Sequence, residues 1–463
     1  QLFFQFITET LILFVFSLAA AIIIIYLLMP LYNNISGKQL LFNINDIKVW
    51  EVIGLSVAGT LVASGIYPAI MLSSFKPIQA LKGKITSGIG IAVFRKMLVV
   101  FQFAISVILI VCTITMSKQM HFIRNKSLGY DKSYVFFVPL PDDARDHIEA
   151  IKTELKKQPG ILDASCIDAY NFTNVSTATG DLSWPAKSPN VNLMITQIST
   201  DKDLIPLMKI KIIEGNNFTG TPADSTKYII NEAAAHAMGL KEPYAGQQIS
   251  LHGVNGTIAG VVKDFNFQSL KEKISPLIFF TFWNNRNILY IRTTADHAQG
   301  SIAAAKKQYE KYATDSPFNY HFLDQEFEKQ YISDQRAGLL FNVFACIAIF
   351  ISCLGLFGLV TFTAQVKVKE IGIRKVLGAS VNGVVQLISK DFLKLVFIGI
   401  VIATPVAWWA MDKWLEGFAY RINIGWWIFV LAGIIALFIA MLTVSFQAIR
   451  AAIANPVKSL RTE

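Results

Sequence analysis

Stretches without any charged residue divide the chain into apolar and polar segments. Six such stretches occur, and a helix that crosses the hydrocarbon core of a bilayer needs about 20 apolar residues. One stretch of this kind is compatible with the buried helix of a soluble core, but six of similar length predict an α-helical membrane protein with six transmembrane helices. The six stretches are Thr10–Gly37, Val52–Phe75, Met97–Ser117, Ala337–Val366, Leu395–Met411 and Ile422–Ile449.

The long polar interval 119–335 alternates between strand and helix patterns, which predict an α+β domain. Asp142–Gln158 and Gln299–Tyr312 have helical spacing, and Asn231 is placed to cap a helix over Ala233–Met238. The polar borders, 118–126 and 324–336, also keep helical spacing and predict a stalk that extends the adjoining spans. Strands are predicted over Tyr134–Val138, Ile161–Ile167, Val191–Ser199, Lys209–Ile213, Tyr228–Ile230, Thr257–Val262, Leu277–Phe282 and Ile288–Arg292.

The net charge of +10 comes from the loops between the apolar stretches. Of 42 Lys and Arg and 32 Asp and Glu, the interval 119–335 holds 22 and 24. Segments 76–96, 367–394 and 450–461 carry 14 basic residues, against four in the alternate loops 31–51 and 412–421. By the positive-inside rule, the first three segments are cytoplasmic, and the two loops and the α+β domain lie outside. The charge therefore indicates orientation in a bilayer, and we expect no nucleic-acid partner.

The two ends of the chain resemble each other. Residues 1–81 and 386–460 each contain two spans and end in Pro-x-x-x-Leu, at Pro77 and Pro456. Chance similarity between two hydrophobic hairpins is the competing interpretation, but the equal placing of the endings favours a duplication, as in many membrane transport proteins. If the repeated unit is one span, an external domain and three spans, residues 94–460 form a whole unit. Residues 1–81 are then expected to be the end of a preceding unit whose earlier part is missing.

The segment Val366–Ser380, VKVKEIGIRKVLGAS, follows the fourth span on the predicted cytoplasmic side. On a helix, its apolar residues gather near one side and most of its basic residues lie elsewhere. Two interpretations stay open on these residues alone: a helix on anionic lipid headgroups, or a docking surface for a protein partner. The candidate residues are Lys369, Glu370, Ile371, Gly372, Ile373, Arg374, Lys375, Leu377, Gly378 and Ala379.

This segment resembles the signature that follows the second span in the FtsX-like domain of MacB-type ABC permeases. Four further stretches resemble parts of the same family. They are FRKMLVVFQFAISVILIV at 94–111, LGYDK at 128–132, GVVKDFNFQSLKEKISPLIF at 260–279 and NPVKSLRTE at 455–463. Together these matches extend over nearly the whole chain, in the double-unit form frequent in Bacteroidota. The chain departs from that form because the first span, external domain, second span and basic helix of a first unit are absent.

The resemblance implies a six-helix membrane protein with a periplasmic α+β domain of the MacB core type. It also implies a division of the chain. Residues 1–81 are the last two transmembrane helices of a first FtsX-like unit, and residues 82–96 are a cytoplasmic linker. Residues 97–118 are a transmembrane helix, and residues 119–335 are the periplasmic domain with its helical stalk. Residues 337–460 are an FtsX-like domain of three transmembrane helices, with a coupling helix over 366–380.

The function that the resemblance implies is that of a permease subunit in a bacterial inner membrane. Such a subunit couples ATP hydrolysis by a partner chain to movement of its periplasmic domain, for export or extraction of a peptide, antibiotic or lipoprotein. The alternative is an FtsX-like regulatory transducer that activates a cell-wall hydrolase, and a membrane-anchored enzyme is the third class. The implied partners are an ABC ATPase subunit, the lipid bilayer, a second permease copy, and a periplasmic adaptor or outer-membrane protein.

Motifs for catalysis do not occur in the sequence. There is no G-x-x-x-x-G-K-[ST] phosphate loop, so ATP and Mg are expected on the partner ATPase, and no cofactor is expected in this chain. The six histidines are scattered through the α+β domain and form no H-x-H or HExxH arrangement. We therefore expect no enzyme activity and no metal site in this chain.

Small and polar residues within the spans predict helix contacts. Ala348, Ser352 and Gly355 share one face of the fourth span and suit close packing. Gln102 is expected to hydrogen-bond a neighbouring helix, and Lys394 lies near enough to the cytoplasmic side for its ammonium group to reach water.

Overall fold

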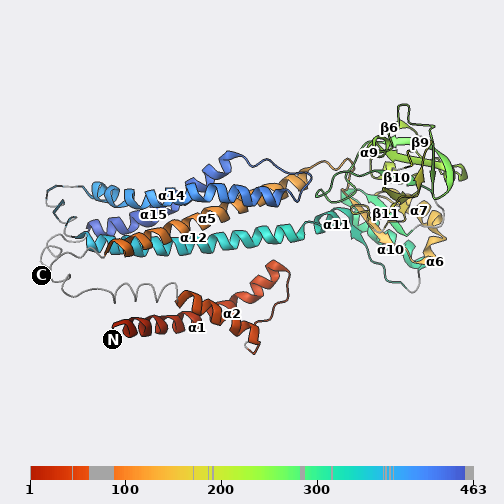
Figure 1. The fold of residues 1–463 in the computed structure, drawn as a ribbon. Helices are drawn as coiled ribbons and strands as arrows, with labels where there is room; N and C mark the ends of the chain where they lie inside the picture. Colours follow the sequence, from red (N-terminus) through yellow and green to blue (C-terminus); the bar gives the residue numbers. More distant parts are fainter. Residues whose placement is uncertain are drawn as a thin grey trace. The chain divides into compact units, whose positions relative to one another are not determined.

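The computed structural model describes two compact units. It describes residues 2–43, 45–61, 88–169, 171–185, 187–189, 192–281, 287–313, 316–368, 370, 373–374, 377–378 and 380–453 (Figure 1). The helical unit comprises residues 1–118, 334–414 and 423–463, and the α+β unit comprises residues 119–333 and 415–422.

Long apolar helices make up the helical unit. They are α1 (Leu2–Ser36), α2 (Ile47–Leu61), α5 (Gly88–Asn125), α12 (Ile332–Val366), α14 (Val381–Leu415) and α15 (Trp426–Ile453). Among the described residues, five segments are long and apolar enough to cross a membrane: Leu11–Ser36, Val93–Asn125, Ile332–Val366, Val385–Leu415 and Trp426–Arg450. The predicted second span, 52–75, lies outside the described residues from position 62 onward.

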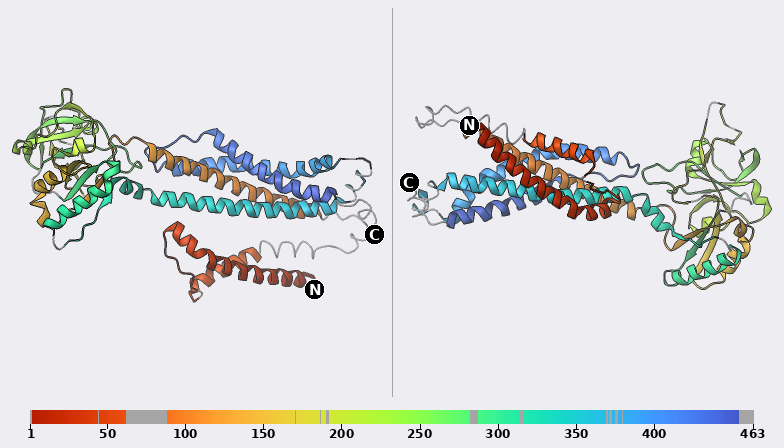
Figure 2. Two further views of the ribbon diagram at one scale, coloured as in Figure 1. Left: turned by 180° about the vertical axis from the view of Figure 1, so that it is seen from behind. Right: turned by 90° about the horizontal axis from the view of Figure 1, so that it is seen from below.

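Helices α5, α12, α14 and α15 lie side by side in a bundle (Figures 1 and 2). Lipid tails are as apolar as leucine, so close packing rather than exclusion of water holds such helices together. Buried alanines meet this requirement, with Ala403 and Ala407 on α14 and Ala432, Ala436 and Ala440 on α15. At Gly399 of α14, a Cβ atom would lie only 3.0 Å from the carbonyl oxygen of Val100 on α5.

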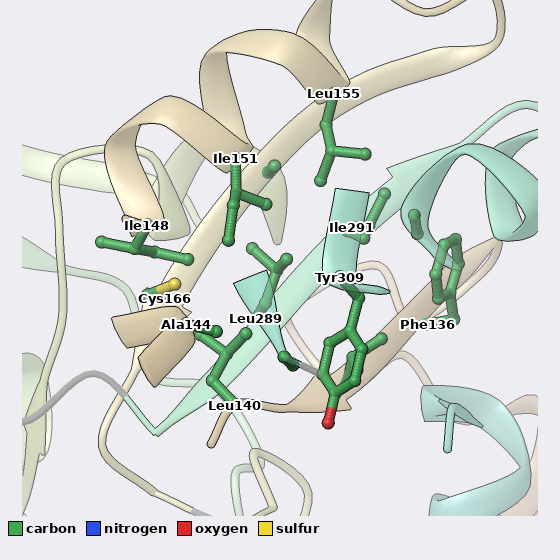
Figure 3. Packing of buried hydrophobic residues seen from close by; sticks show 14 of the residues in the cluster. Phe136, Leu140, Ala144, Ile148, Ile151, Leu155, Cys166, Leu289, Ile291 and Tyr309 are labelled. Carbon is green, nitrogen blue, oxygen red and sulfur yellow. The ribbon is translucent and has the colours of Figure 1, made fainter. Parts of the chain in front are cut away.

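The α+β unit contains two sheets, and the first is antiparallel with the order β12-β1-β11-β2. Its strands are β1 (Val135–Pro139), β2 (Ile161–Ile167), β11 (Ile288–Thr293) and β12 (His321–Phe322). Three helices, α6 (Asp142–Arg145), α7 (Ile148–Lys156) and α10 (Ala298–Tyr312), pack on this sheet through one apolar cluster (Figure 3). Ile151 and Leu155 of α7 and Tyr309 of α10 pack in this cluster with Leu289 and Ile291 of β11.

The second sheet has eight strands in the order β3-β5-β10-β7-β9-β8-β4, with β6 also pairing with β9. The pairs β5–β10 and β7–β9 are parallel, and the other pairs are antiparallel. The strands are β3 (Ala178–Thr179), β4 (Leu182–Ser183), β5 (Ile195–Ser199), β6 (Ile212–Gly215), β7 (Lys227–Asn231), β8 (Gln248–Leu251), β9 (Val254–Val262) and β10 (Leu277–Phe280). The α+β unit also contains the short helices η2 (Pro222–Thr226), η3 (Ala295–His297), α8 (Leu204–Leu207) and α9 (Glu232–Ala237).

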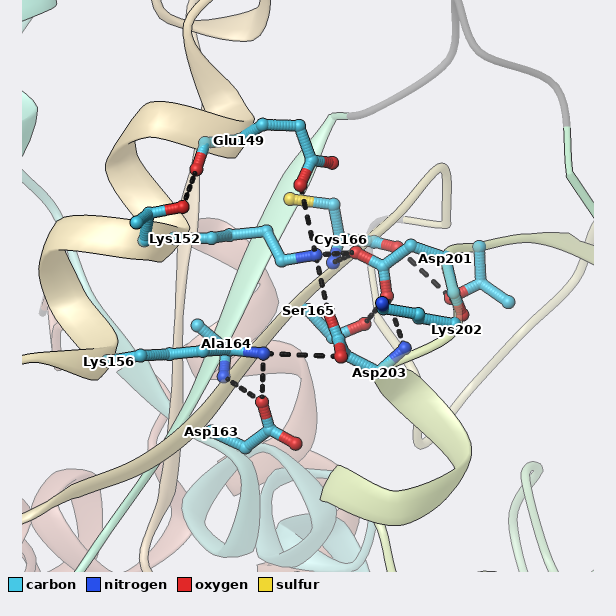
Figure 4. A network of polar contacts seen from close by, with 12 residues as sticks. Glu149, Lys152, Lys156, Asp163, Ala164, Ser165, Cys166, Asp201, Lys202 and Asp203 are labelled. Carbon is cyan, nitrogen blue, oxygen red and sulfur yellow. Dashed lines mark hydrogen bonds and ion pairs between the residues drawn. The ribbon is translucent and has the colours of Figure 1, made fainter. Parts of the chain in front are cut away.

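A buried ion network joins α7 to β2 and to the segment that precedes α8 (Figure 4). The Lys152 side chain is 5% exposed, and its Nζ atom lies 2.6 Å from carboxylate oxygens of both Asp201 and Asp203. Asp201 also accepts hydrogen bonds from the Ser165 hydroxyl and the Cys166 backbone N–H. Burial alone would lower the pKa of Lys152, but the two carboxylates outweigh burial and raise it.

Most of the predicted strands are confirmed. The predicted Asn231 cap is also confirmed, since the Asn231 side chain accepts a hydrogen bond from the N–H of Ala234. Some of the predicted bounds are wrong. The strand predicted over Val191–Ser199 begins only at Ile195. The helix predicted over Asp142–Gln158 is divided at His147, whose φ and ψ of −103° and 11° are not helical. The strand predicted over Lys209–Ile213 begins only at Ile212, because Lys209 makes a turn with a φ of +55°.

Candidate functional site

The predicted coupling segment 366–380 is only partly within the described residues. Lys369, Ile371, Gly372, Lys375 and Ala379 lie outside them. Where the segment is described, Glu370 and Arg374 form an ion pair at 2.8 Å across one helical turn. The N–H of Leu377 donates to the carbonyl oxygen of Ile373 at 3.0 Å, as in a helix.

Two apolar side chains of this segment face outward. Ile373 is 53% exposed and Leu377 80% exposed, and their spacing of four residues places them on one helix face. Gly378 follows with a φ of +91°, the left-handed conformation that ends many helices and that glycine adopts without strain. Ile373 and Leu377 therefore form an exposed apolar pair just before Gly378, which we call the apolar step.

The residues predicted to pack helices lie between α12 and α5. Ser352 is buried, with its hydroxyl 3.1 Å from that of Ser106 on α5. A Cβ atom at Gly355 would lie 2.5 Å from Oε1 of Gln102, so the Gln102 amide occupies the space that glycine leaves. Ala348 is half-buried.

Inside the α+β unit, four segments that are distant in sequence meet in a structure that we call the collar. It consists of residues 128–132, 264–271, 323–331 and 415–422, together with Gln119 near the C-terminal end of α5. Three of these segments adjoin the helical unit along the chain: the first through α5, the third through α12, and the fourth as the loop between α14 and α15. The collar is the part of the α+β unit in which all chain connections to the helical unit come together.

Residues 128–132 lead from α5 into the sheets. The carbonyl oxygen of Leu128 accepts a hydrogen bond of 2.7 Å from the N–H of Asn266. Gly129 has a φ of +85°, and a Cβ atom there would lie 2.8 Å from Cβ of Phe265, so glycine is required for both conformation and space. The buried Tyr130 ring contacts Phe172 and Phe265 edge-on, with centroids 5.2 and 6.1 Å away.

Asp131, in the same segment, joins the α5 connection to the central strand β11. One of its carboxylate oxygens lies 2.9 Å from Nζ of Lys209 and 3.2 Å from Nη1 of Arg292, whose side chain is 6% exposed. Desolvation would raise the pKa of Asp131, but the two cations and a backbone hydrogen bond outweigh it and lower the pKa to about 2. The ionised carboxylate therefore persists well below neutral pH.

Residues 323–331, which include helix α11 (Leu323–Lys329), lead from the sheet to α12. The structure breaks the predicted continuous stalk helix at Tyr331, because this side chain turns into the α+β unit and is 1% exposed. Its hydroxyl accepts a hydrogen bond of 2.7 Å from the N–H of Leu270. Arg124 of α5 and Glu328 of α11 pair at 3.1 Å, and Lys132 lies 3.6 Å from the ring centroid of Phe327.

The loop 415–422 pairs with the same segment, 264–271. The N–H groups of Ala419 and Tyr420 donate to the carbonyl oxygens of Lys271 and Leu270, at 3.2 and 3.3 Å. Gln119, which is fully buried, holds the loop with both ends of its amide. Its Nε2 donates to the carbonyl oxygen of Tyr420, and its Oε1 accepts from the N–H of Ile422, each at 2.9 Å.

Two lysine side chains also make cation–π contacts with aromatic rings of the loop 415–422. Nζ of Lys126 lies 4.4 Å from the ring centroid of Tyr420, and Nζ of Lys271 lies 5.1 Å from that of Phe418. Segment 264–271 thus contacts the α5 connection through Asn266 and both other connections through Leu270. All three connections are therefore hydrogen-bonded to this one segment.

The sequence predicts parts of the collar but not their assembly. The stretches 128–132 and 260–279 resemble parts of MacB-type ABC permeases, but nothing in them predicts that they meet. Gln119 and the loop 415–422 were not predicted as functional. Two aromatic residues in a short polar loop, Phe418 and Tyr420, were the available signal for a docked loop.

Within the residues that the structure describes, no group of three or more His, Cys, Asp and Glu residues could hold a metal ion. Asp264, just after the end of strand β9, accepts a hydrogen bond from the N–H of Ala233, and its own N–H donates to the carboxylate of Glu232. Its carboxylate thus has a structural role at the start of α9.

Comparison with known proteins gives a family match over most of α12, over α14 and α15, and over the loop 415–422. Residues 342–456 match the model of the FtsX-like permease C-terminal family. No curated protein matches the chain.

Several solved structures resemble part of the chain at low identity, among them the following three. The periplasmic region of MacB from Actinobacillus actinomycetemcomitans is 13% identical with a TM-score of 0.32, over 44% of this chain and 94% of that one. The extracellular domain of the noncanonic ABC-type transporter YknZ from Gram-positive bacteria is 14% identical with a TM-score of 0.30, over 40% and 97%. A domain of a putative permease protein from Porphyromonas gingivalis is 13% identical with a TM-score of 0.29, over 41% and 89%.

Proposed function

We propose that this chain, whose residues 342–456 match the FtsX-like permease C-terminal family, is the permease subunit of an ABC transporter and transmits ATP-driven movement to its α+β unit through the collar. ATP is bound and hydrolysed by a separate ABC ATPase subunit. The protein lies in the inner membrane of a bacterium with the α+β unit on the periplasmic side. Its work is export of a substrate, or extraction of a substrate from the membrane.

The observation that carries this proposal is the convergence on segment 264–271. Helix α5 runs without a break from Gly88 to Asn125, a length of about 57 Å at 1.5 Å per residue. Such a helix is a stiff rod that carries a displacement from its inner end to its outer end. At the outer end, hydrogen bonds of 2.7–3.3 Å connect segment 264–271 to all three connections.

The input side is the apolar step formed by Ile373 and Leu377. An exposed leucine that becomes buried in a partner pocket contributes roughly 1.5–3 kcal/mol, whereas exposed ion pairs contribute about 0–1 kcal/mol. Apolar contact is therefore expected to dominate binding of the ATPase. If the segment instead rests on lipid headgroups, each basic residue contributes about 1 kcal/mol, and the ranking is reversed.

Co-purification of the ATPase with the full-length permease tests the input. We expect Leu377→Asp to abolish co-purification. The matched control is Lys367→Ala, which removes only a partly exposed ion pair with Asp391 at 3.8 Å and is expected to retain the ATPase. Normal binding of Leu377→Asp together with loss of binding in Lys367→Ala would contradict docking through the apolar step.

A collar variant tests the output. Gln119→Leu is expected to bind the ATPase as wild type does, because Gln119 lies in the α+β unit, but to lose coupling between ATP hydrolysis and transport. The measurement is the ratio of substrate moved to ATP hydrolysed in reconstituted vesicles. An unchanged ratio in Gln119→Leu would contradict transmission through the collar while leaving the ATPase contact intact.

A further inference from the structure

A groove lies between α5 and α12 in the helical unit, toward the start of α5. The two helices are antiparallel, and their register brings Ser106 beside Ser352 and Gln102 beside Gly355. Two turns further along, Arg95 lies beside Phe362, with its guanidinium carbon 4.7 Å from the ring centroid. The helices touch at the serine pair, and the groove runs from there toward Arg95.

The groove has a volume of about 370 Å³, and its walls are mostly apolar. Leu98 and Leu354 are 44% and 55% exposed on its two sides. Gly358 forms part of the lining, and a Cβ atom there would meet nothing within 4 Å. The space therefore exists because α12 has glycine at a position where a larger side chain would fit.

A cation stands at one end of this apolar groove and an amide at the other. Among the residues that the structure describes, no carboxylate lies within 4 Å of Arg95. Lys96 beside it is exposed. The distribution of basic residues predicts that this end faces the cytoplasm, and Gln102 lies seven residues, or about 10 Å, deeper along α5.

We propose that the groove binds an anionic phospholipid of the cytoplasmic leaflet, with the phosphate at Arg95 and one acyl chain along Gly358 toward Gln102. An apolar channel that ends in a cation at the membrane surface fits an amphiphile with an anionic head, and basic pockets between transmembrane helices are suited to anionic headgroups. A helix of a second copy is the competing occupant. It would have to place a carboxylate beside Arg95 at the membrane boundary, where unpaired charges are costly.

Native mass spectrometry of the purified full chain tests the proposal, with phosphatidylglycerol and phosphatidylcholine as probes. Wild type is expected to retain phosphatidylglycerol in preference to phosphatidylcholine. Arg95→Gln should reduce this preference about fivefold, which corresponds to about 1 kcal/mol for one basic residue at 1.4 kcal/mol per factor of ten. Gly358→Leu fills the groove and should reduce retention of both lipids.

Matched controls change the same residue types elsewhere. Arg450→Gln removes an exposed basic residue at the end of α15, and Gly59→Leu adds a side chain on α2 where a Cβ atom meets nothing within 4 Å. Both should retain lipid as wild type does. The proposal is overturned if Arg95→Gln and Gly358→Leu behave like these controls. It is also overturned if Gly358→Leu changes the oligomeric state while lipid retention is unchanged, because a second copy would then occupy the groove.

Discussion

Replacing Gln119 by leucine should release the loop 415–422 from the rest of the α+β unit. The Gln119 amide is fully buried and makes two hydrogen bonds of 2.9 Å, to the carbonyl oxygen of Tyr420 and the N–H of Ile422. Leucine has nearly the same volume and satisfies neither group. Each buried polar group left without a partner costs about 1–3 kcal/mol, so the docked state of the loop loses about 2–6 kcal/mol.

Hydrogen exchange measured by mass spectrometry checks this magnitude. A loss of about 2 kcal/mol, the lower limit, raises the exchange rate of the loop amides about 30-fold, since 1.4 kcal/mol is a factor of ten. Peptides from β1 and β11 should exchange as in wild type. The control is Gln248→Leu, which changes an exposed glutamine on β8. Exchange of residues 415–422 within threefold of wild type in Gln119→Leu would refute the reasoning.

Three further predictions concern the stability and orientation of the chain. Lys152→Met leaves Asp201 and Asp203 without their buried cation and should destabilise the α+β unit by about 3–5 kcal/mol, measured as a lower thermal unfolding temperature; an unchanged temperature would contradict the network. Burial raises the pKa of Asp168 from 3.8 to about 6, so the folded state binds the Asp168 proton more tightly than the unfolded state. The free energy of unfolding should therefore rise as the pH falls from about 6 to about 4. This rise should be smaller in Asp168→Asn. Alkaline phosphatase fusions should be active after Ser36, Ala223 and Gly417 and inactive after Gly88 and Ser380, and activity after Ser380 would reverse the predicted topology.

The sequence predicted those elements that depend on local pattern. Long charge-free stretches predicted the apolar helices, and alternation predicted strands such as β2 and β11. The β8–β9 hairpin was missed in part, because its turn depends on His252 and Gly253, both with positive φ of 52° and 75°. Histidine in that conformation gives no reliable pattern in a single sequence.

The collar could not be predicted because its contacts are tertiary. The hydrogen bonds from Ala419 and Tyr420 to Lys271 and Leu270 are made by backbone groups, which any residue type supplies. Gln119 is a polar residue near the end of a long helix, where sequence alone suggests exposure, and yet it is fully buried. Tyr331 ends a helical pattern only because its side chain is buried against Leu270.

Hydrogen exchange in the collar of the assembled permease–ATPase complex tests the central claim most directly. The complex would be measured without nucleotide and again with ATP trapped at the partner ATPase. If ATP-driven movement reaches the α+β unit through the collar, peptides covering residues 264–271 and 415–422 will change their exchange rates at least about tenfold, while peptides from β1 and β11 will not change. Equal exchange of the collar peptides in the two states would contradict the account.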